Sequence, residues 1–166
     1  LAWHDIRVPG FATWRSGETL EIRGDLRYPV IVKPLQSDAS TGIAQASVVQ
    51  DEASLLERVT LVHERFHQPA IAEEFVDGRE MALSVIEDED GPRGLPPVQI
   101  LLPKGALYSR KRKWGHRGPA FRPAAFPGPD ADLLRVAALS AFRALGLADL
   151  ARFDVRLAER GPVFLE

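Results

Sequence analysis

Short runs of apolar residues, separated by polar residues, glycine and proline, recur along most of this chain. Such runs, rich in valine and isoleucine and closed by turn-forming residues, are typical of strands. The runs that predict strands span residues 28–34, 43–49, 70–76, 80–86, 98–102, 150–158 and 162–166. The dipeptide Asp77-Gly78 and the segment 159–161 are expected to be the turns of two hairpins.

Two other segments have the three-to-four-residue spacing of a helix with one apolar face. The first is expected to begin after an N-cap at Asp51 and to end near Phe66, before Gln68-Pro69. The second runs from about residue 130 to 145 and ends on Gly146, a typical C-terminal residue. Hairpins mixed with helices predict an α+β fold, with helices packed against antiparallel-rich sheets.

Composition narrows the classes of protein. With 45% hydrophobic residues, 166 residues are enough for one domain or two small lobes. The formal charge of −2 disfavours a nucleic-acid partner, and no apolar run has the roughly 20 residues of a membrane span. The absence of cysteine excludes disulfides and thiolate catalysis, and it favours a cytoplasmic setting. Both ends, at Leu1 and Glu166, are expected to be cuts through a longer protein.

The stretch "VHERFH" contains the H-E-x-x-H pattern, with His63 and His67 four residues apart. On a helix both imidazoles would face one way and could share a zinc ion, with Glu64 as a general base. The motif lies in the last turn of its expected helix, and the extended form would place glycine at Ala70. A pair of imidazoles that favours the negative end of the helix dipole is the structural alternative.

Lys33 closes the apolar run "YPVIVKP" and is followed by the loop "LQSDASTG". A lysine at a strand end is ordinarily solvated. Here the hydroxyls and backbone amides of the loop, which ends at Gly42, come within reach of its ammonium group. That combination suits a phosphate-covering loop, although it is not a P-loop sequence.

Three carboxylates surround the turn in "EEFVDGRE". Alternation along residues 71–76 turns Glu73 and Glu74 to opposite faces of the strand, and Glu80 lies on the next strand. One acid must therefore point towards a packed side, which is costly unless it is paired or binds a ligand. A surface hairpin remains the alternative.

Charged residues also gather in two later segments. The run Arg110–Trp114 contains four consecutive basic residues and suggests a solvated loop, a nucleic-acid patch or, in an acidic chain, a polyphosphate site. On the expected strand 150–158, Arg152, Asp154 and Arg156 share a face, and Glu166 ends the next strand. Carboxylates at Asp154 and Glu166 would suit Mg²⁺ and Arg152 a phosphoryl group, whereas cross-strand ion pairs are the structural alternative.

In this order and spacing, "PVIVKP…STGIA", "AEEFVDGREMALSV" and "ARFDVRLAERGPVFLE" resemble the ATP-grasp fold, and within it the D-alanine–D-alanine ligase group. The resemblance covers about residues 28–166. It implies two antiparallel-rich lobes that hold ATP, and a carboxylate substrate phosphorylated to an acylphosphate that an amine attacks. The implied organisation is a leading linker at 1–24, a small lobe at 25–75 and a truncated C-terminal lobe at 76–166.

The resemblance also implies residue roles. Lys33 would bind the α- and β-phosphates, and Ser40, Thr41 and Gly42 would belong to the loop over the γ-phosphate. The adenine pocket would be lined by Glu73, Glu74 and Val76, and Glu80 would bind the ribose. Lys113, beside Trp114, would contact phosphate from a mobile loop. Arg152 would stabilise the transferring phosphoryl group, and Asp154 and Glu166 would bind Mg²⁺ or Mn²⁺.

The implied partners are small amino-acid-like substrates, with no nucleic acid and no membrane; a homodimer is compatible with the resemblance. A non-catalytic nucleotide-binding relative is the alternative function, and a zinc hydrolase based on His63 and His67 is a more distant one.

Overall fold

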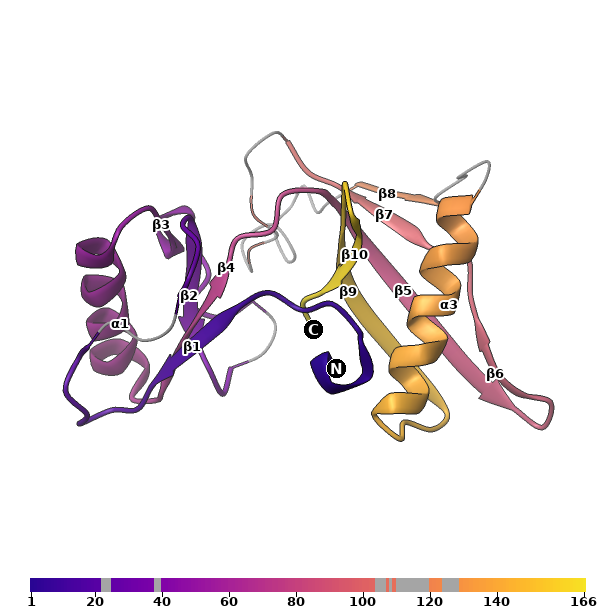
Figure 1. The fold of residues 1–166 in the computed structure, drawn as a ribbon, viewed down its shortest axis with the longest axis horizontal. Coiled ribbons are helices and arrows are strands. Elements are labelled where there is room, and N and C mark those ends of the chain that lie inside the picture. The colour runs from indigo at the N-terminus through magenta and orange to yellow at the C-terminus, as the bar shows by residue number, and fades with distance from the viewer. Residues whose placement is uncertain (22–24, 38–39, 104–106, 108, 110–119, 124–128) are drawn as a thin grey trace. The chain divides into compact units, whose positions relative to one another are not determined.

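The computed structural model describes residues 1–21, 25–37, 40–103, 107, 109, 120–123 and 129–166, without the side chains of 129 and 130. The chain forms two compact units (Figure 1). The N-terminal unit is built around Pro9–Phe75. The C-terminal unit comprises Leu1–Val8, Val76–Leu101 and Ala120–Glu166. Antiparallel sheets with packed helices confirm the predicted α+β class.

The N-terminal unit is a four-stranded antiparallel sheet with one helix on one face. Its strands, in spatial order, are β1 (Phe11–Trp14), β4 (Ala70–Glu74), β2 (Val30–Pro34) and β3 (Val48–Val49). Helix α1 (Glu52–Phe66) buries Leu55, Val59 and Val62 against Val30 and Val32 of β2. Because strand side chains alternate, Ile31 and Lys33, which alternate with these valines, lie on the face that α1 does not cover.

Helix α1 has the predicted boundaries. The Asp51 carboxylate accepts a hydrogen bond from the Ser54 backbone amide at 2.8 Å, which confirms the predicted N-cap. This bond lowers the pKa of Asp51. At the other end His67 adopts a left-handed conformation with φ 53°, and its amide donates to the His63 carbonyl.

Two segments in the first part of the chain differ from the expected structure. Residues 1–24, expected to be a linker, include the 3-10 turn η1 (Ala2–His4) of the C-terminal unit and strand β1 of the N-terminal unit, which places Trp14 in the core and pairs with β4. The expected strand 43–49 is instead the 3-10 turn η2 (Gln45–Ser47) followed by the two-residue β3. The buried Ser47 hydroxyl accepts a bond from the Ala44 amide, and this local bond favours a turn over a strand.

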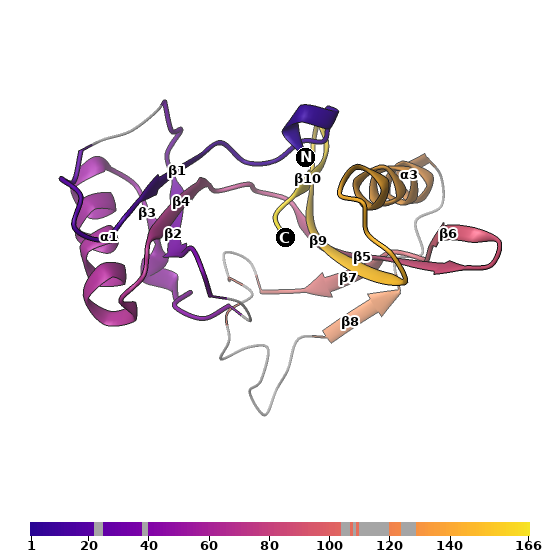
Figure 2. The same cartoon turned by 90° about the horizontal axis from the view of Figure 1, so that it is seen from below.

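The C-terminal unit is a six-stranded antiparallel sheet. The strands, in spatial order, are β10 (Gly161–Phe164), β9 (Leu150–Ala158), β5 (Arg79–Asp88), β7 (Val98–Leu101) and β8 (Ala120–Pro123), with β6 (Gly91–Gly94) paired to β5. Helix α3 (Pro129–Ala144) covers one face, as Figure 2 shows. Leu134 and Phe142 of α3 pack on Met81, Leu83 and Val155 of the sheet.

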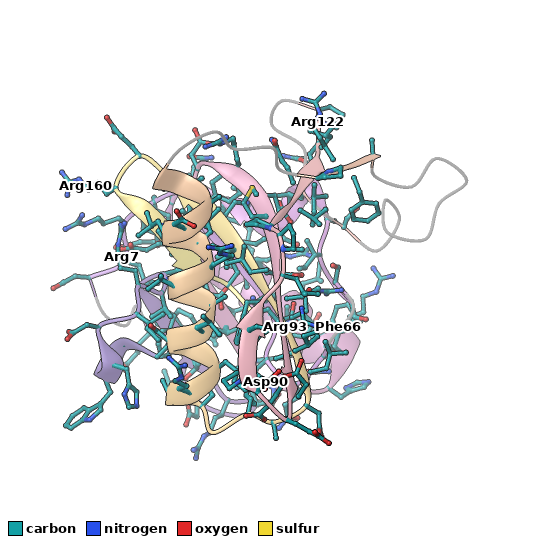
Figure 3. All side chains as sticks on the ribbon, turned by 90° about the vertical axis from the view of Figure 1, so that its right-hand side faces the viewer. Arg7, Phe66, Asp90, Arg93, Arg122 and Arg160 are labelled. Carbon is teal, nitrogen blue, oxygen red and sulfur yellow. The ribbon has the colours of Figure 1, made fainter. Side chains whose placement is uncertain are left out.

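Two strands of this sheet, β6 and β8, lie outside the runs predicted to be strands. Within 87–97, β5 continues to Asp88 and turns through Gly91, with φ 99°, into β6. Arg93 closes this hairpin, since its Nε lies 3.1 Å from the Asp88 carboxylate; Figure 3 labels Arg93 and Asp90. Strand β8 likewise lies in a proline-rich segment in which no strand was expected. No described helix is both long and apolar enough to span a membrane.

Candidate functional site

In the N-terminal unit the predicted phosphate-binding lysine is held by an acid. Lys33 of β2 and Glu73 of β4 lie on the sheet face opposite α1, and Lys33 directly faces Ile71 in the register. Glu73, two residues further along β4, is therefore a diagonal neighbour. The Lys33 Nζ lies 2.7 Å from its carboxylate, and the side chains are 26% and 14% exposed. This partly shielded pair leaves a positioned ammonium group on the sheet face that α1 does not cover.

Glu74 is a structural carboxylate. Its Oε1 accepts a hydrogen bond from the Arg27 amide at 3.0 Å, and its own amide donates to the Gly10 carbonyl at 2.8 Å. A side chain at Gly10 would meet the Glu74 carboxyl carbon at 2.9 Å. Glu74 therefore ties the chain segments that flank the sheet, through groups that do not face the Lys33–Glu73 pair.

The loop after β2 is attached at both ends. At its start the Leu35 amide donates to the Pro69 carbonyl and the Gln36 amide to the Gln68 side chain, each at 2.8 Å. At its end the Gly42 carbonyl accepts bonds from Arg58 Nη2 at 2.8 Å and from the Ser47 hydroxyl at 3.1 Å. Between these ends lie the half-buried Ser40 and Thr41. Ser40 and Gly42 have positive φ values of 59° and 75°.

In the C-terminal unit the candidate residues share the sheet face that α3 leaves uncovered. The register of β5 with β9 places Glu80 opposite Arg156, Ala82 opposite Asp154, and Ser84 opposite Arg152. The intervening residues, Met81 and Phe153 among them, are buried under α3. Strand alternation therefore brings two acids and two arginines into one row.

Glu80 and Arg156 form a buried ion pair. Arg156 Nη2 lies 2.5 Å from Glu80 Oε2, and Arg156 Nη1 donates to the Gly78 carbonyl at 3.3 Å. The two side chains are only 8% and 12% exposed. Burial raises the pKa of Glu80, while the charge of Arg156 and its hydrogen bond oppose this rise and the charge of Asp154 adds to it. The pair holds one carboxylate oxygen of Glu80 in place.

Asp154 is held from its own strand. Arg152 Nε donates to Asp154 Oδ1 at 2.9 Å and Arg152 Nη2 to Oδ2 at 3.4 Å. The Asp154 side chain is 13% exposed, whereas that of Arg152 is 53% exposed. The outer guanidinium group is thus accessible to an anion, and the carboxylate is preoriented.

Glu166 is brought to Asp154 by a β-bulge. The amides of Leu165 and Glu166 both donate to the Asp154 carbonyl, at 2.9 and 3.3 Å, and the Asp154 amide donates to the Glu166 carbonyl at 2.9 Å. Two residues thus oppose one, the pattern by which a bulge re-aims a side chain. Strict alternation from buried Phe164 would turn Glu166 back towards α3, yet Glu166 is exposed.

Comparison with known proteins decides the family. A sequence model described as "D-ala D-ala ligase C-terminus" matches residues 2–166. The chain belongs to this ligase family.

Relatives and solved structures agree with that assignment. The chain is 32% identical over 164 residues to "Uncharacterized protein y4sG" of Sinorhizobium fredii, covering 96% of this chain and 47% of that protein. It is 31% identical over 168 residues to a D-alanine–D-alanine ligase of Syntrophotalea carbinolica, covering 100% of this chain and 52% of that enzyme. The chain therefore spans about half the length of these relatives.

The fold is that of ATP-grasp ligases. The D-alanine–D-alanine ligase of Bacillus anthracis in complex with ATP matches the whole chain over 50% of its own length, with a TM-score of 0.78 and 20% identity. The VanG D-Ala:D-Ser ligase of Enterococcus faecalis matches 99% of the chain over 48% of its own length, with a TM-score of 0.79 and 24% identity. These matches confirm the predicted fold class.

Within this D-Ala–D-Ala ligase domain, the predicted residues fall into two groups. Lys33, Glu73 and the loop 40–42 belong to the N-terminal unit, and Glu80, Arg152, Asp154 and Glu166 to the C-terminal unit. Val76 is the first residue of the segment Val76–Leu101, which belongs to the C-terminal unit. Lys113, with the rest of the basic run 110–114, lies outside the described residues. The nucleotide and metal roles of all these residues remain predictions.

The alternative zinc site is not formed. Helix α1 ends at Phe66, so His67 has left the helical register in which two imidazoles would face one way. The His63 ring nitrogen Nε2 lies 3.0 Å from the Trp14 carbonyl and is a donor there. In the described part of the chain, no three histidine or carboxylate side chains are grouped to hold a metal ion.

Two arginines have roles that sequence reasoning missed. Arg156 was noted only as a neighbour of Asp154 on one strand face, and Arg58 was not noted. The partner of Arg156 lies 76 residues away and the carbonyl that Arg58 binds lies 16 residues away. A single usable signal was present: Arg58 stands between Leu55 and Val59, on the apolar edge of a helix, where a charge requires a partner.

Proposed function

We propose that the protein to which this chain belongs is an ATP-dependent carboxylate–amine ligase with small amino-acid-like substrates. The observation that carries the proposal is the row of charges on the uncovered face of the C-terminal sheet. There Arg152 presents an exposed guanidinium group beside Asp154, and a bulge pairs the backbone of Glu166 with that of Asp154. Membership in the D-Ala–D-Ala ligase family supports this reading.

Asp154 and Glu166 fit a hard divalent cation. Both are carboxylates, and oxygen ligands are the ones that Mg²⁺ and Mn²⁺ prefer. Mg²⁺ usually binds through one or two carboxylates and completes its shell with water and substrate phosphates, so two protein ligands are sufficient. A bound divalent ion would supply charge neutralisation for the triphosphate.

The remaining residues bind and orient the nucleotide in this proposal. Lys33 contacts the α- and β-phosphates, and Ser40, Thr41 and Gly42 offer amides and hydroxyls to the γ-phosphate. Glu73 and Val76 line the adenine pocket through backbone groups. Glu74 does the same, because its carboxylate accepts a hydrogen bond from the Arg27 backbone amide. Glu80 accepts a hydrogen bond from the ribose with the carboxylate oxygen that Arg156 does not bind.

The proposed reaction has two steps. A substrate carboxylate oxygen attacks the γ-phosphorus, the bond to the β–γ bridging oxygen breaks, and ADP leaves behind an acylphosphate. An amine nitrogen then attacks the acyl carbon, inorganic phosphate departs, and the nitrogen loses a proton. Arg152 stabilises the charge of the transferring phosphoryl group, because such transfer depends mainly on positioning and charge neutralisation.

Calorimetry tests nucleotide binding on this chain. A non-hydrolysable ATP analogue with Mg²⁺ should bind, and Lys33→Met and Asp154→Asn should each weaken binding by about tenfold or more, as expected for the loss of one charge-assisted contact. Arg143→Ala, on the exposed side of α3, is the matched control and should bind as the original chain does.

Turnover tests the ligase reaction on the full-length protein. ADP and phosphate should be released only when amino acids are supplied, and a dipeptide-like product should form. Nucleotide binding without such turnover would favour the non-catalytic relative. If the analogue fails to bind both the chain and the full-length protein, the proposal is wrong.

A further inference from the structure

Arg58 is a half-buried cation with no acidic partner in the part of the chain that the structure describes. It projects from α1, and no described carboxylate lies within ion-pair distance of it. Its Nε is buried and has no hydrogen-bond partner among the described residues. Burial lowers the pKa of Arg58, and the charge of Arg65 lowers it further. Shielding a guanidinium group from water in this way is costly, so its remaining contacts must compensate.

Those contacts converge on the end of the loop after β2. Arg58 Nη2 donates to the Gly42 carbonyl at 2.8 Å and to the Ser47 hydroxyl at 2.7 Å. Ser47, which is fully buried, donates in turn to the Gly42 carbonyl at 3.1 Å and accepts from the Ala44 amide at 3.0 Å. The hydroxyl thus makes three hydrogen bonds, which is its full capacity for one donor and two lone pairs.

Packing fixes the same point. Gly42 has φ +75°, and a Cβ built there would lie 2.6 Å from Pro34 Cδ and 3.2 Å from Phe66 Cζ. No side chain fits, because Pro34 and Phe66 already close the space. The loop therefore returns to the sheet at a point defined by a steric contact on one side and by the Arg58 network on the other.

We propose that Arg58 is a positioning residue, which fixes the Gly42 end of the loop and thereby holds Ser40 and Thr41 ready for an anionic ligand. The consequence for nucleotide rests on the proposed function, whereas the anchoring itself does not. Preorganisation of this kind lowers the cost of ordering a loop when the ligand binds. An apolar side chain such as that of methionine could fill part of the space, but it could not donate hydrogen bonds to Gly42 and Ser47.

Hydrogen exchange on the whole chain tests the anchoring. In Arg58→Ala the amides of Ile43, Ala44 and Ser47 should exchange roughly 10- to 100-fold faster, as expected for the loss of hydrogen bonds to a charged group. Exchange of the Val32 and Ala72 amides, in the centre of the same sheet, should change much less. Arg143→Ala is the control and should leave the whole pattern unchanged.

Two further variants keep the test decisive. Should Arg58→Ala fail to fold, Ser47→Ala removes one of the two acceptors of Arg58 and should accelerate exchange at Ile43, whose amide bonds to the Ser40 carbonyl and not to Ser47. Arg58→Lys retains the charge but replaces the planar guanidinium fork by a single ammonium nitrogen, and it should show an intermediate rate. Two results would overturn the inference. A uniform rise of exchange rates over the N-terminal unit would indicate a merely structural role for Arg58, and unchanged rates at Ile43 and Ala44 would indicate that Arg58 does not anchor the loop.

Calorimetry separates this inference from the proposed function. Where the original chain binds the ATP analogue, Arg58→Ala should bind it roughly 10-fold more weakly, and unchanged affinity would contradict the positioning role. Where the original chain binds no nucleotide, the proposed function fails, and the exchange of Ile43 and Ala44 alone decides whether Arg58 anchors the loop.

Discussion

Replacing Arg156 by methionine would leave the Glu80 carboxylate buried without its cation. Both side chains are about nine-tenths buried, and Arg156 Nη2 lies 2.5 Å from Glu80 Oε2. Removing one partner of a buried ion pair commonly costs about 3–5 kcal/mol, because the other charge remains unpaired. Since Glu80 can take up a proton instead, we expect the lower end of that range, about 3 kcal/mol, at pH 7.

The loss should depend on pH with a defined sign. Burial raises the pKa of Glu80 in the folded state. Protonation of Glu80 therefore favours the folded state. This contribution is complete below the pKa of the unfolded chain, about 4.3, and is lost as the pH rises through the folded-state pKa. Arg156 opposes this rise, so the variant has a still higher folded pKa. The destabilisation relative to the original chain should therefore be smallest near pH 4, about 1 kcal/mol, and should grow towards pH 7.

Hydrogen exchange of strand amides measures the free energy of unfolding of the C-terminal unit, in which Glu80 and Arg156 lie. Of the two tryptophans that the structure describes, Trp14 lies in the N-terminal unit and Trp3 is 94% exposed, so the fluorescence of these two does not report on the C-terminal sheet. Protection factors for the Met81 and Val155 amides, between pH 4 and 7, do. The double variant Glu80→Gln with Arg156→Met should recover to within about 1 kcal/mol of the original. A loss that is equal at every pH would refute the reasoning.

Three further predictions concern folding. Gly42→Ala should destabilise the N-terminal unit by about 2 kcal/mol or more in urea titrations, since the new methyl group meets Pro34 at 2.6 Å and φ is positive; full stability would show that the loop end is not fixed. Asp51→Ala should lower the thermal midpoint at pH 7 but not in acid below the lowered pKa of Asp51, because a depressed carboxyl pKa contributes stability only above it; a pH-independent change would contradict the cap. Leu134→Ala, fully buried, should cost about 2–5 kcal/mol and Leu133→Ala, 47% exposed, much less; equal losses would contradict the placement of α3.

Local pattern was sufficient for the elements that bury a long, regular face. Helix α1 was predictable because an N-cap at Asp51 and apolar residues at helical spacing act within a few residues of one another. Strands β5 and β9 were predictable from their apolar residues, and the expected strand 150–158 already placed Arg152, Asp154 and Arg156 on one face. The family resemblance rested on the same segments.

Short elements were not predictable because their structure depends on distant partners. Strand β1 has four residues and β3 two, and each is a strand only because β4 or β2 pairs with it. Strand β6 contains glycine and proline, which locally disfavour a strand, yet it pairs with β5 through a turn at Gly91.

The sequence by itself determined the class of fold, the main helices and strands, and the residue types able to bind a magnesium–triphosphate. Only the tertiary structure decided which groups meet: the side chains of Glu80 with Arg156 and of Lys33 with Glu73, the backbone of Glu166 with that of Asp154 at a bulge, and the Arg58 guanidinium group with the Gly42 carbonyl. The physical reason is that side-chain periodicity is a local property, whereas the register between strands is set by the packing of whole faces. A shift by one residue would preserve every strand and separate every one of the cross-strand pairs.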